Sequence, residues 1–575
     1  MDNREDTLSR NQQSRNEEEL LSNTTNSPVD MDALRMSMPS TETDIVQAME
    51  CLEVEERELR HYDKTRGHAS HTHTSLHEGR TLLERRIEER RSWLSPIHKL
   101  PFEILADIIS YASVTSRGYS LEIPQDKLGS SIEAPICLLS HVSIWWRTVA
   151  LSLPRLWASL SVDVYHAEPK HYALVALFDQ RSQGLESLKL DIVAHPRHGR
   201  TPLRNQSEMV SSFGQIGYDL LALLVQLLPR CRELHLSTKR HCFLLTVEVA
   251  GLALPFLTSF VDKTWGPFVD TPAHSFWGAI QRAPQLKQLE VCNHVEDALY
   301  PYGQVSSLVI VWPFTLEALQ RPVSLLRAIG SCVQLESLTL LRYMQWNEGA
   351  NQVRVELPTL RHLTLESTAS PKTLDSLLNC LRNLPSLVSF ECRHPLDRIG
   401  HIRWEWSRSE SRSFIRLLEQ CANTLQSLHL HHKSYMISTE LLVMVLRATP
   451  NLTSVQLEFT TAQDQDSSTL FWLCAEMNVD MSLVPHLREL SVHEWMPSAQ
   501  LQSLDLEEIV TMLETRSRAK SSLADVKIFF CKDHDDRDET GLETTPSRKH
   551  MKQDLLDRLQ RLRDEGMDCS IMIRQ

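Results

Sequence analysis

The feature that most constrains the fold of this chain is a short apolar motif, L-x-x-L-x-L with apolar substitutions, which recurs from residue 185 onward. The end of the motif alternates apolar and polar residues, which predicts a short β-strand with one buried face. The spacing between copies is mostly 25 to 38 residues, with outliers near 19 and 46. Twelve copies begin at Leu185, Cys231, Leu257, Leu286, Val305, Leu335, Leu360, Leu387, Leu425, Leu452, Leu487 and Leu523.

Helical patterns occupy the segments between copies, for example residues 374–381, 414–418 and 441–446. A strand followed by a helix cannot bury its apolar side alone, whereas stacked units share one continuous core. The chain is therefore predicted to form an α/β solenoid, with parallel strands on a concave wall and helices on a convex wall. Prolines precede many copies and end the helix before the strand; they are Pro255, Pro284, Pro358, Pro385, Pro450 and Pro485.

In this motif, residues 161–575 resemble the leucine-rich-repeat proteins. The repeats depart from that family because they lack a regular Asn after the strand, which puts the tight ladder of its regular members in doubt here. Irregular and longer units are expected. The chain ends in a segment that fits a final unit. Residues 552–563 form an amphipathic pattern with Leu555, Leu559 and Leu562 on one face, Gly566 can cap the helix, and residues 569–573 can form a closing strand.

A second pattern lies before the array, in residues 96–160. It reads L-P-x-E-I-L-x-x-I-I from Leu100, then L-L-S-x-V from Leu138 after a loop of about 22 residues, then W-R-x-V-A from Trp146. In this order the three pieces resemble the F-box, in the form found in large families of basidiomycete fungi. The resemblance implies a small all-α domain that docks on a Skp-type adaptor through Leu100, Pro101, Ile104, Leu105, Ile108, Leu138, Val142 and Trp146. For Trp146, core packing and adaptor contact are both open interpretations.

The N-terminal 95 residues divide in two. Residues 1–40 are polar and almost without aromatics, so they are predicted to be disordered. Residues 41–95 have helical patterns, and they predict an antiparallel helical pair, a coiled coil or a dimer contact. Between the two helical runs, residues 68–77 contain four histidines, which we interpret as a solvated helix break rather than a metal site.

Composition limits the partners. The formal net charge is −14, which argues against binding nucleic acid, because neutralising phosphates needs a basic surface. The 12 cysteines include no CxxC pair, as expected for reduced intracellular thiols. The N-terminus lacks an apolar signal, and the most apolar stretch, residues 220–228, is too short to cross a bilayer. A soluble protein of the cytoplasm or nucleus, without a membrane partner, is expected.

The chain has no P-loop, no G-x-G-x-x-G after a strand, no H-E-x-x-H and no G-x-S-x-G, so we expect no enzyme, no cofactor and no metal. The polar groups at residues 431–432 and 534–536 are interpreted as exposed side chains. Trp404 and Trp406, beside Arg403 and Arg408, are candidates for client binding, with core packing as the other interpretation.

Together with the resemblance, these observations predict the substrate-recognition subunit of a Skp–cullin–F-box ubiquitin ligase. Its F-box would bind a Skp-type adaptor, and through it a cullin–RING ligase, while the repeats bind an unidentified protein client. The main alternative is a leucine-rich-repeat scaffold that is not connected to ubiquitination. A weaker third possibility is a hydrolase whose site lies in the repeats.

Overall fold

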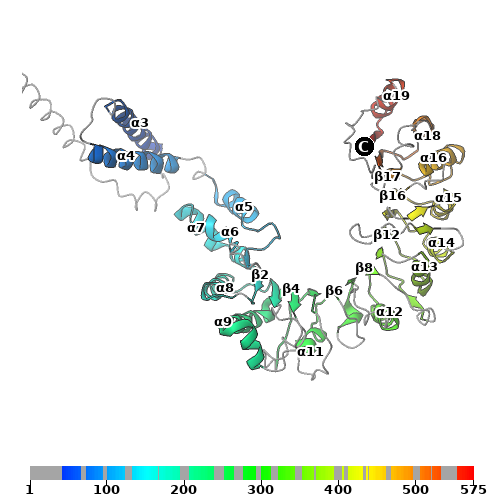
Figure 1. Ribbon diagram of the computed structural model, residues 1–575, viewed down its shortest axis with the longest axis horizontal. Helices are drawn as coiled ribbons and strands as arrows, with labels where there is room; N and C mark the ends of the chain where they lie inside the picture. Colours follow the sequence, from blue (N-terminus) through cyan, green and yellow to red (C-terminus); the bar gives the residue numbers. More distant parts are fainter. Residues whose placement is uncertain are drawn as a thin grey trace, which may run out of the picture. The chain divides into compact units, whose positions relative to one another are not determined.

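The protein, described here from a computed structural model, forms two compact units, which Figure 1 shows coloured along the sequence. The first unit comprises Met1–Val162 with Lys170–Leu185, and the second comprises Asp163–Pro169 with Glu186–Gln575. Within the described part of the chain, no helix combines the length and apolarity needed to span a membrane. The described residues are 42–65, 73–94, 100–123, 132–165, 167–194, 206–238, 251–264, 276–292, 300–311, 322–343, 353–367, 371–393, 404–406, 412–431, 435–437, 439–460, 468–496, 506–519, 521–532 and 553–574.

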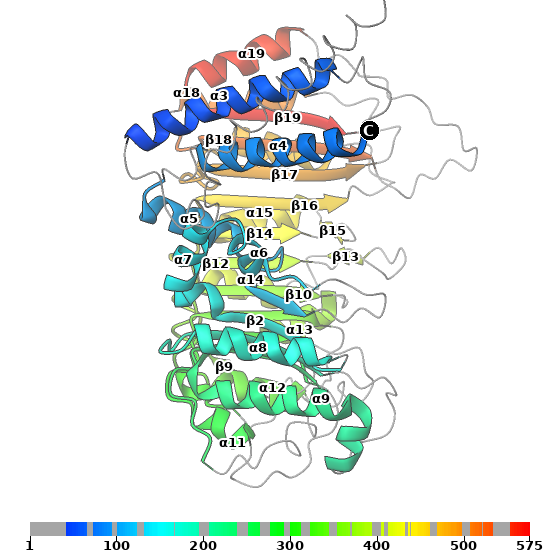
Figure 2. The same ribbon diagram turned by 90° about the vertical axis from the view of Figure 1, so that its left-hand side faces the viewer.

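The first unit contains a helical hairpin made of α3 (Glu42–Thr65) and α4 (His73–Leu94), which lie side by side in Figure 2. The two helices are antiparallel, because residues later in α4 form ion pairs with residues earlier in α3. Arg80 pairs with Asp63 near the connection, and Arg90 pairs with the buried Glu55 farther along. Of the arrangements expected for residues 41–95, the antiparallel pair is confirmed, whereas the predicted disordered tail lies outside the described residues.

Three short helices follow in the same unit: α5 (Phe102–Ala112), α6 (Pro135–Leu139) and α7 (Ile144–Ser152), which contact one another. After them, the 3-10 turn η2 (Pro154–Trp157) leads into strand β2 (Ser159–Asp163). The long loop between α5 and α6 contains a strand that the sequence pattern did not predict, β1 (Leu121–Ile123), which is parallel to β2. Helix α8 (Pro169–Arg181) completes this region through an edge-to-face contact of Trp157 with Phe178.

In the second unit every predicted motif forms a strand, and these strands pair in parallel in the order in which they occur in the chain. The alternating apolar residues cause this, because each strand buries every second side chain on one face. The strands are β3 (Leu188–Ala194), β4 (Cys231–Thr238), β5 (Ser259–Asp262), β6 (Gln288–Cys292), β7 (Ser307–Val311), β8 (Ser337–Tyr343), β10 (His362–Ser367), β12 (Ser389–Arg393), β14 (Ser427–His431), β16 (Ser454–Thr460), β17 (Glu489–Met496), β18 (Asp525–Lys532) and β19 (Asp568–Arg574).

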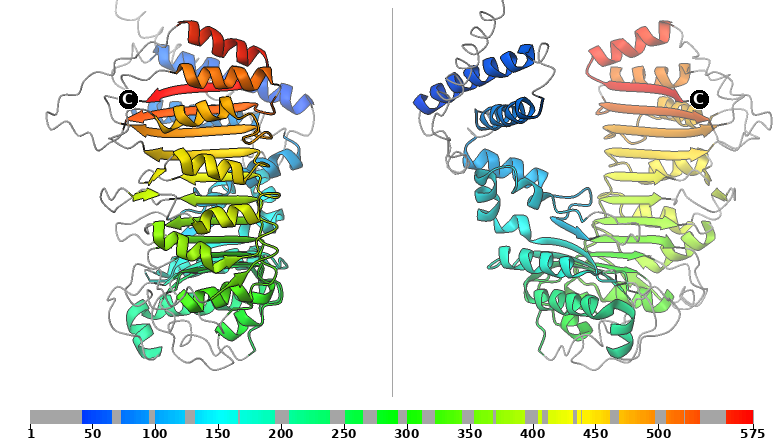
Figure 3. Two further views of the ribbon diagram at one scale, coloured as in Figure 1. Left: turned by 90° about the vertical axis from the view of Figure 1, so that its right-hand side faces the viewer. Right: turned by 60° about the vertical axis from the view of Figure 1, so that its left-hand side comes forward.

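Helices cover the apolar face of this sheet, and Figures 1 and 3 show them on one side of the strands. The residues between the buried ones therefore point to the opposite side, which we call the free face. The solenoid-like α/β arrangement predicted for this region is confirmed. The helices are α9 (Gln206–Leu227), α11 (Phe276–Gln281), α12 (Pro322–Ser331), α13 (Pro371–Cys380), α14 (Arg412–Gln420), α15 (Thr439–Ala448), α16 (Thr469–Val479), α18 (Glu507–Arg518) and α19 (Gln553–Asp564), with the 3-10 turns η3 (Leu228–Arg230) and η4 (Tyr302–Gln304).

Successive repeats are joined by main-chain hydrogen bonds just before the strands. The carbonyl oxygen of Gln426 accepts the N–H groups of both Thr453 and Ser454, at 2.8 and 2.9 Å. The carbonyl oxygen of Thr453 accepts those of Arg488 and Glu489 in the same way, at 2.8 and 3.0 Å. These bonds lie ahead of the strands and involve backbone groups alone, so the expectation about the ladder after the strands stays a prediction.

The C-terminal unit follows its sequence pattern closely. Leu555, Leu559 and Leu562 are buried on one face of α19. Gly566 has a φ of 97°, a left-handed conformation that favours glycine, and its N–H donates to the carbonyl of Arg563 at 2.9 Å. Two small parallel pairs lie outside the main sheet and were not predicted: β9 (Val355–Glu356) with β11 (Leu381–Arg382), and β13 (Trp404–Trp406) with β15 (Tyr435–Ile437).

Candidate functional site

The residues that the F-box resemblance assigns to adaptor contact lie in and beside α5, α6 and α7. Leu138 on α6 is 74% exposed, Val142 after α6 is 55% exposed, and Ile104 and Ile108 on α5 are 48% and 39% exposed. Pro101 is also exposed, and Leu100 is half-buried. Six of the eight residues are thus accessible to a partner, at least in part.

The other two, Leu105 and Trp146, are core residues. Leu105 is fully buried on the inner face of α5 with Ala106 and Ile109. Trp146 is buried on α7, so core packing is the interpretation that the structure supports for it. Both side chains hold the helices in place and are not available to a partner in this conformation.

Polar contacts fix the turn between α6 and α7. The Ser143 side chain caps α7 by accepting the backbone N–H of Trp146 at 3.2 Å. The guanidinium of Arg147 donates from Nε to the carbonyl oxygen of Ser140 at 3.0 Å, and this ties the start of α7 to the end of α6. These two hydrogen bonds therefore hold in place the turn that carries the exposed Leu138 and Val142.

Helix α5 is apolar on two neighbouring faces, which is unusual for a helix at the surface of a protein. One face is buried within the unit, and the other displays Ile104 and Ile108, which are one turn apart. Exposed apolar side chains grouped in this way mark surfaces that bind other proteins. Full burial of one such side chain contributes about 1.5–3 kcal/mol.

Trp404 and Trp406, the client-binding candidates, are the ends of β13, which pairs with β15. Their side chains lie outside the described part of the structure. Client binding at these residues therefore stays a prediction.

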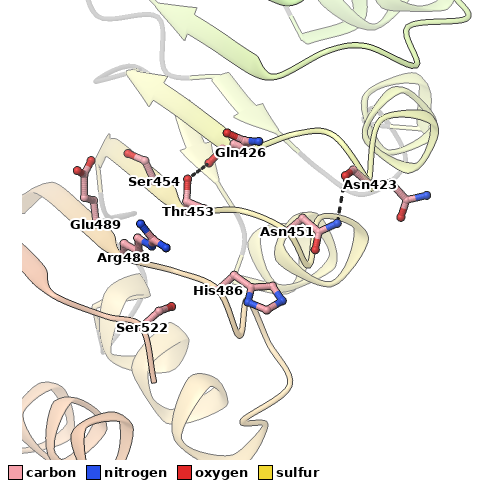
Figure 4. A pocket seen from close by; sticks show the side chains of 9 residues that line it. All are labelled: Asn423, Gln426, Asn451, Thr453, Ser454, His486, Arg488, Glu489 and Ser522. Carbon is pink, nitrogen blue, oxygen red and sulfur yellow. Dashed lines mark hydrogen bonds between the residues drawn. The ribbon is translucent and has the colours of Figure 1, made fainter. Parts of the chain in front are cut away.

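A polar cavity of about 620 Å³ lies where β14, β16, β17 and β18 begin, and Figure 4 shows its lining. Three of its side chains are engaged with the backbone of the preceding repeat, among them Ser522, which donates to the carbonyl of Leu487 at 2.9 Å. Asn451 donates to the carbonyl of Asn423 at 3.2 Å, and Thr453 donates to that of Gln426 at 3.1 Å. We interpret the cavity as a product of repeat stacking rather than as a catalytic site. It is lined by Asn423, Gln426, Asn451, Thr453, Ser454, His486, Arg488, Glu489 and Ser522.

Eight of the nine described cysteines of the repeats are buried in the core. Burial raises the pKa of Cys332, Cys392 and Cys421 to about 12 each, which keeps these thiols protonated at neutral pH. A protonated buried thiol is a poor nucleophile. Cys231, Cys332, Cys380 and Cys421 are all buried and pack as small hydrophobic residues.

One group of polar side chains on the free face has the composition of a metal site: Glu391, His429 and His431. One donor atom from each lies within 4.8 Å of the others. Burial lowers the pKa of His429, and the Glu391 carboxylate opposes this shift. The sequence prediction included no metal site and interpreted His431 as an exposed side chain, whereas it is the last residue of β14 and is partly buried. Aligning successive repeats by their strand positions would have revealed the group, because Glu391 and His429 occupy the same position in adjacent copies.

The chain was also compared with known proteins: no family model matches it, and no match was found among curated proteins. The residues and their geometry are therefore the basis for the function proposed below.

Proposed function

We propose that this chain is the substrate-recognition subunit of a Skp–cullin–F-box ubiquitin ligase. The observation that carries the proposal is the display of Ile104, Ile108, Leu138 and Val142 on short helices whose sequence resembles an F-box. In this proposal these side chains dock in an apolar groove of a Skp-type adaptor, and the repeats bind a protein client.

The chain would make and break no covalent bonds itself. Binding the client and the adaptor at once would raise the effective concentration of client lysines near a charged ubiquitin-conjugating enzyme. The repeats suit this task, because a stacked parallel sheet presents an extended and rigid surface.

The proposal can be tested by measuring binding of the full chain to a purified Skp-type adaptor. We expect Ile108→Asp combined with Leu138→Asp to weaken binding by at least about 100-fold, because each change replaces apolar burial with an unpaired carboxylate. Both residues are exposed, so the free energy of unfolding should change little.

Val479→Asp is the matched control, because Val479 is an exposed apolar residue at the end of α16 in the second unit. It should leave adaptor binding unchanged. An adaptor that does not bind the wild-type chain, or binds the double variant equally well, would overturn the proposal.

The second candidate is a repeat scaffold in which α5–α7 have a purely structural role. The burial of Leu105 and Trp146 favours it, since two of the motif residues already serve packing. Under this alternative neither the wild-type chain nor the double variant would bind the adaptor, and the two would be equally stable, so the binding measurement separates the candidates.

A further inference from the structure

We propose that Glu391, His429 and His431 form a binding site for a divalent transition-metal ion of the zinc type on the free face of the sheet. Two imidazoles and one carboxylate are a donor set that zinc commonly takes, with the fourth position left to water or to another ligand. The proposal is independent of the adaptor function and can fail or succeed without it.

The three residues are held on adjacent strands. Glu391 on β12 and His429 on β14 are register partners, and His431 lies two residues farther along β14 on the same face. Behind them, Phe390, Leu428 and Leu430 are buried in the core. A site built on strands anchored in this way is more rigid than one built on a loop.

The donor atoms are close to ligating positions. Oε1 of Glu391 lies 4.0 Å from Nδ1 of His429 and 3.9 Å from Nε2 of His431. Donors at zinc bond lengths of about 2.0–2.1 Å in tetrahedral geometry are separated by about 3.4 Å. Side-chain rotations that shorten each distance by about half an ångström would complete the geometry, and all three side chains are partly exposed.

The second nitrogen of each histidine already has a partner. Nε2 of His429 lies 2.9 Å from the Ser427 hydroxyl, and Nδ1 of His431 lies 3.5 Å from a Glu458 carboxylate oxygen. The other Glu458 oxygen accepts the indole N–H of Trp495 at 3.1 Å. A carboxylate accepts but cannot donate, so Glu458 favours the tautomer of His431 in which Nδ1 is protonated and Nε2, which faces Glu391, carries the lone pair. The Ser427 hydroxyl can donate or accept, so it is compatible with a lone pair on Nδ1 of His429. Glu458 is thus a positioning residue for the site.

Arg393 is the group that competes with a metal ion. Its guanidinium pairs with Oε1 of Glu391, the same oxygen that faces the two histidines. The Arg393 side chain is 54% exposed, so it can turn into solvent when a cation takes its place. The charge of an ion would replace the charge of the guanidinium beside the same carboxylate.

The donor set also selects among ions. Magnesium and calcium prefer oxygen ligands, whereas imidazole suits zinc, copper and nickel. We therefore expect the full chain, stripped of metal with a chelator, to bind Zn²⁺ with micromolar or tighter affinity and to show no competition from millimolar Mg²⁺.

The experiment is a Zn²⁺ titration of the stripped full chain, read by calorimetry and by Co²⁺ absorption as a spectroscopic probe. The variant His429→Ala with His431→Ala should lose one bound ion per chain and the tetrahedral Co²⁺ bands. Any Zn²⁺ held by the histidines of residues 68–77 would persist in this variant, so the difference between the two proteins measures the proposed site. His235→Ala is the control, because His235 occupies the equivalent free-face position on β4.

Three further variants give graded outcomes. Glu391→Gln preserves the shape of the side chain and should weaken Zn²⁺ binding at least about 10-fold. Glu458→Gln should weaken it about 10- to 100-fold without changing the stoichiometry. Arg393→Gln should tighten it several-fold by removing the competing cation. Equal Zn²⁺ stoichiometry and affinity in the wild type and the His429→Ala/His431→Ala variant, or no Zn²⁺ binding by the wild type below about 100 μM, would overturn the proposal.

Discussion

Helix α5 and the repeat sheet differ in how far their apolar side chains are exposed to solvent. On α5, Ile104 and Ile108 remain 48% and 39% exposed, although the helix has already buried Leu105 and Ile109. In the sheet, the motif leucines such as Leu363 and Leu428 are almost fully buried. A repeat uses its apolar residues to join its neighbours, whereas α5 retains apolar residues that nothing within its own unit covers. Exposed apolar residues of this kind fit a role in binding another protein.

The two regions also differ in their outward surfaces. The free face of the sheet displays polar groups at the positions between its buried residues, including Glu391, His429 and Glu458. Recognition there would depend on charge, hydrogen bonds or metal coordination, while recognition at α5–α7 would depend on apolar burial. The predictions below test this division, from the largest expected effect to the smallest.

The largest contrast is expected within α5 itself. Leu105→Ala should lower the free energy of unfolding by about 3 kcal/mol, because it removes a fully buried side chain and leaves a cavity. Ile104→Ala, one residue away, should lower it by less than about 1 kcal/mol, because half of that side chain already lies in water. Urea unfolding combined with hydrogen exchange at the α5 amides would measure both. An equal decrease in the free energy of unfolding for the two variants would mean that Ile104 is packed as tightly as Leu105 and that α5 exposes no apolar face.

A comparable test in the repeats concerns Arg516 of α18, whose buried guanidinium donates to the carbonyl oxygens of Met477 and Leu483, each at 3.0 Å. These bonds satisfy carbonyls at and beyond the end of α16, which would otherwise be buried without partners. Arg516→Met should lower the free energy of unfolding by about 2–3 kcal/mol. The control Arg518→Ala, at an exposed residue of the same helix, should cost less than about 0.5 kcal/mol in urea unfolding.

The strands of the repeats could be predicted from the sequence because a single local rule determines them. An L-x-L tail has a period of two, and every predicted copy from Leu185 to Leu523 is a strand in the structure. The buried face of α19 was predictable for the same reason, from its helical period. Local periodicity is enough to predict a helix or strand whose buried side packs against the core of its own repeat.

Other features depend on contacts between distant residues. Strand β1 forms because Leu121 pairs with Leu160, and no periodicity in residues 113–134 predicts it. The exposure of Ile104 and the burial of Leu105 could not be separated by the motif, since both residues are apolar and match the F-box pattern. The group of Glu391, His429 and His431 joins residues about 40 positions apart, and only the register of neighbouring strands brings them together.

A third prediction concerns pH. Burial raises the pKa of Asp163 to about 6, although the carboxylate accepts the backbone N–H of Tyr165 at 2.8 Å. A pKa raised in the folded state means that the protonated form is favoured there, so stability is highest below the unfolded pKa of about 3.9 and falls as the pH rises through 6. At ~1.4 kcal/mol per pKa unit, the loss is at most roughly 3 kcal/mol.

Asp163→Asn should remove this loss, because the amide oxygen can still accept the Tyr165 N–H while the charge is absent. We expect the variant to be more stable than the wild type by about 1–2 kcal/mol at pH 8 and equal to it at pH 4. Urea unfolding at both values would measure the difference. A variant that is equally stable or less stable at pH 8 would show that the Asp163 charge is solvated or paired in the folded state.

The smallest effect is expected on the free face. His429→Gln combined with His431→Gln, measured by urea unfolding in the presence of a chelator, should change the free energy of unfolding by less than about 0.5 kcal/mol. Both histidines are partly exposed, and their distances to Glu391 are 3.9–4.0 Å, so without metal their interactions with Glu391 are weak, and a Gln side chain can still form hydrogen bonds at both positions. With saturating Zn²⁺, a site of micromolar affinity would stabilise the wild type relative to this variant by about 2.7 kcal/mol at an ion concentration 100 times the Kd. A large loss of stability in chelator would instead mean that the free face, like the apolar face behind it, is required to hold the repeats together.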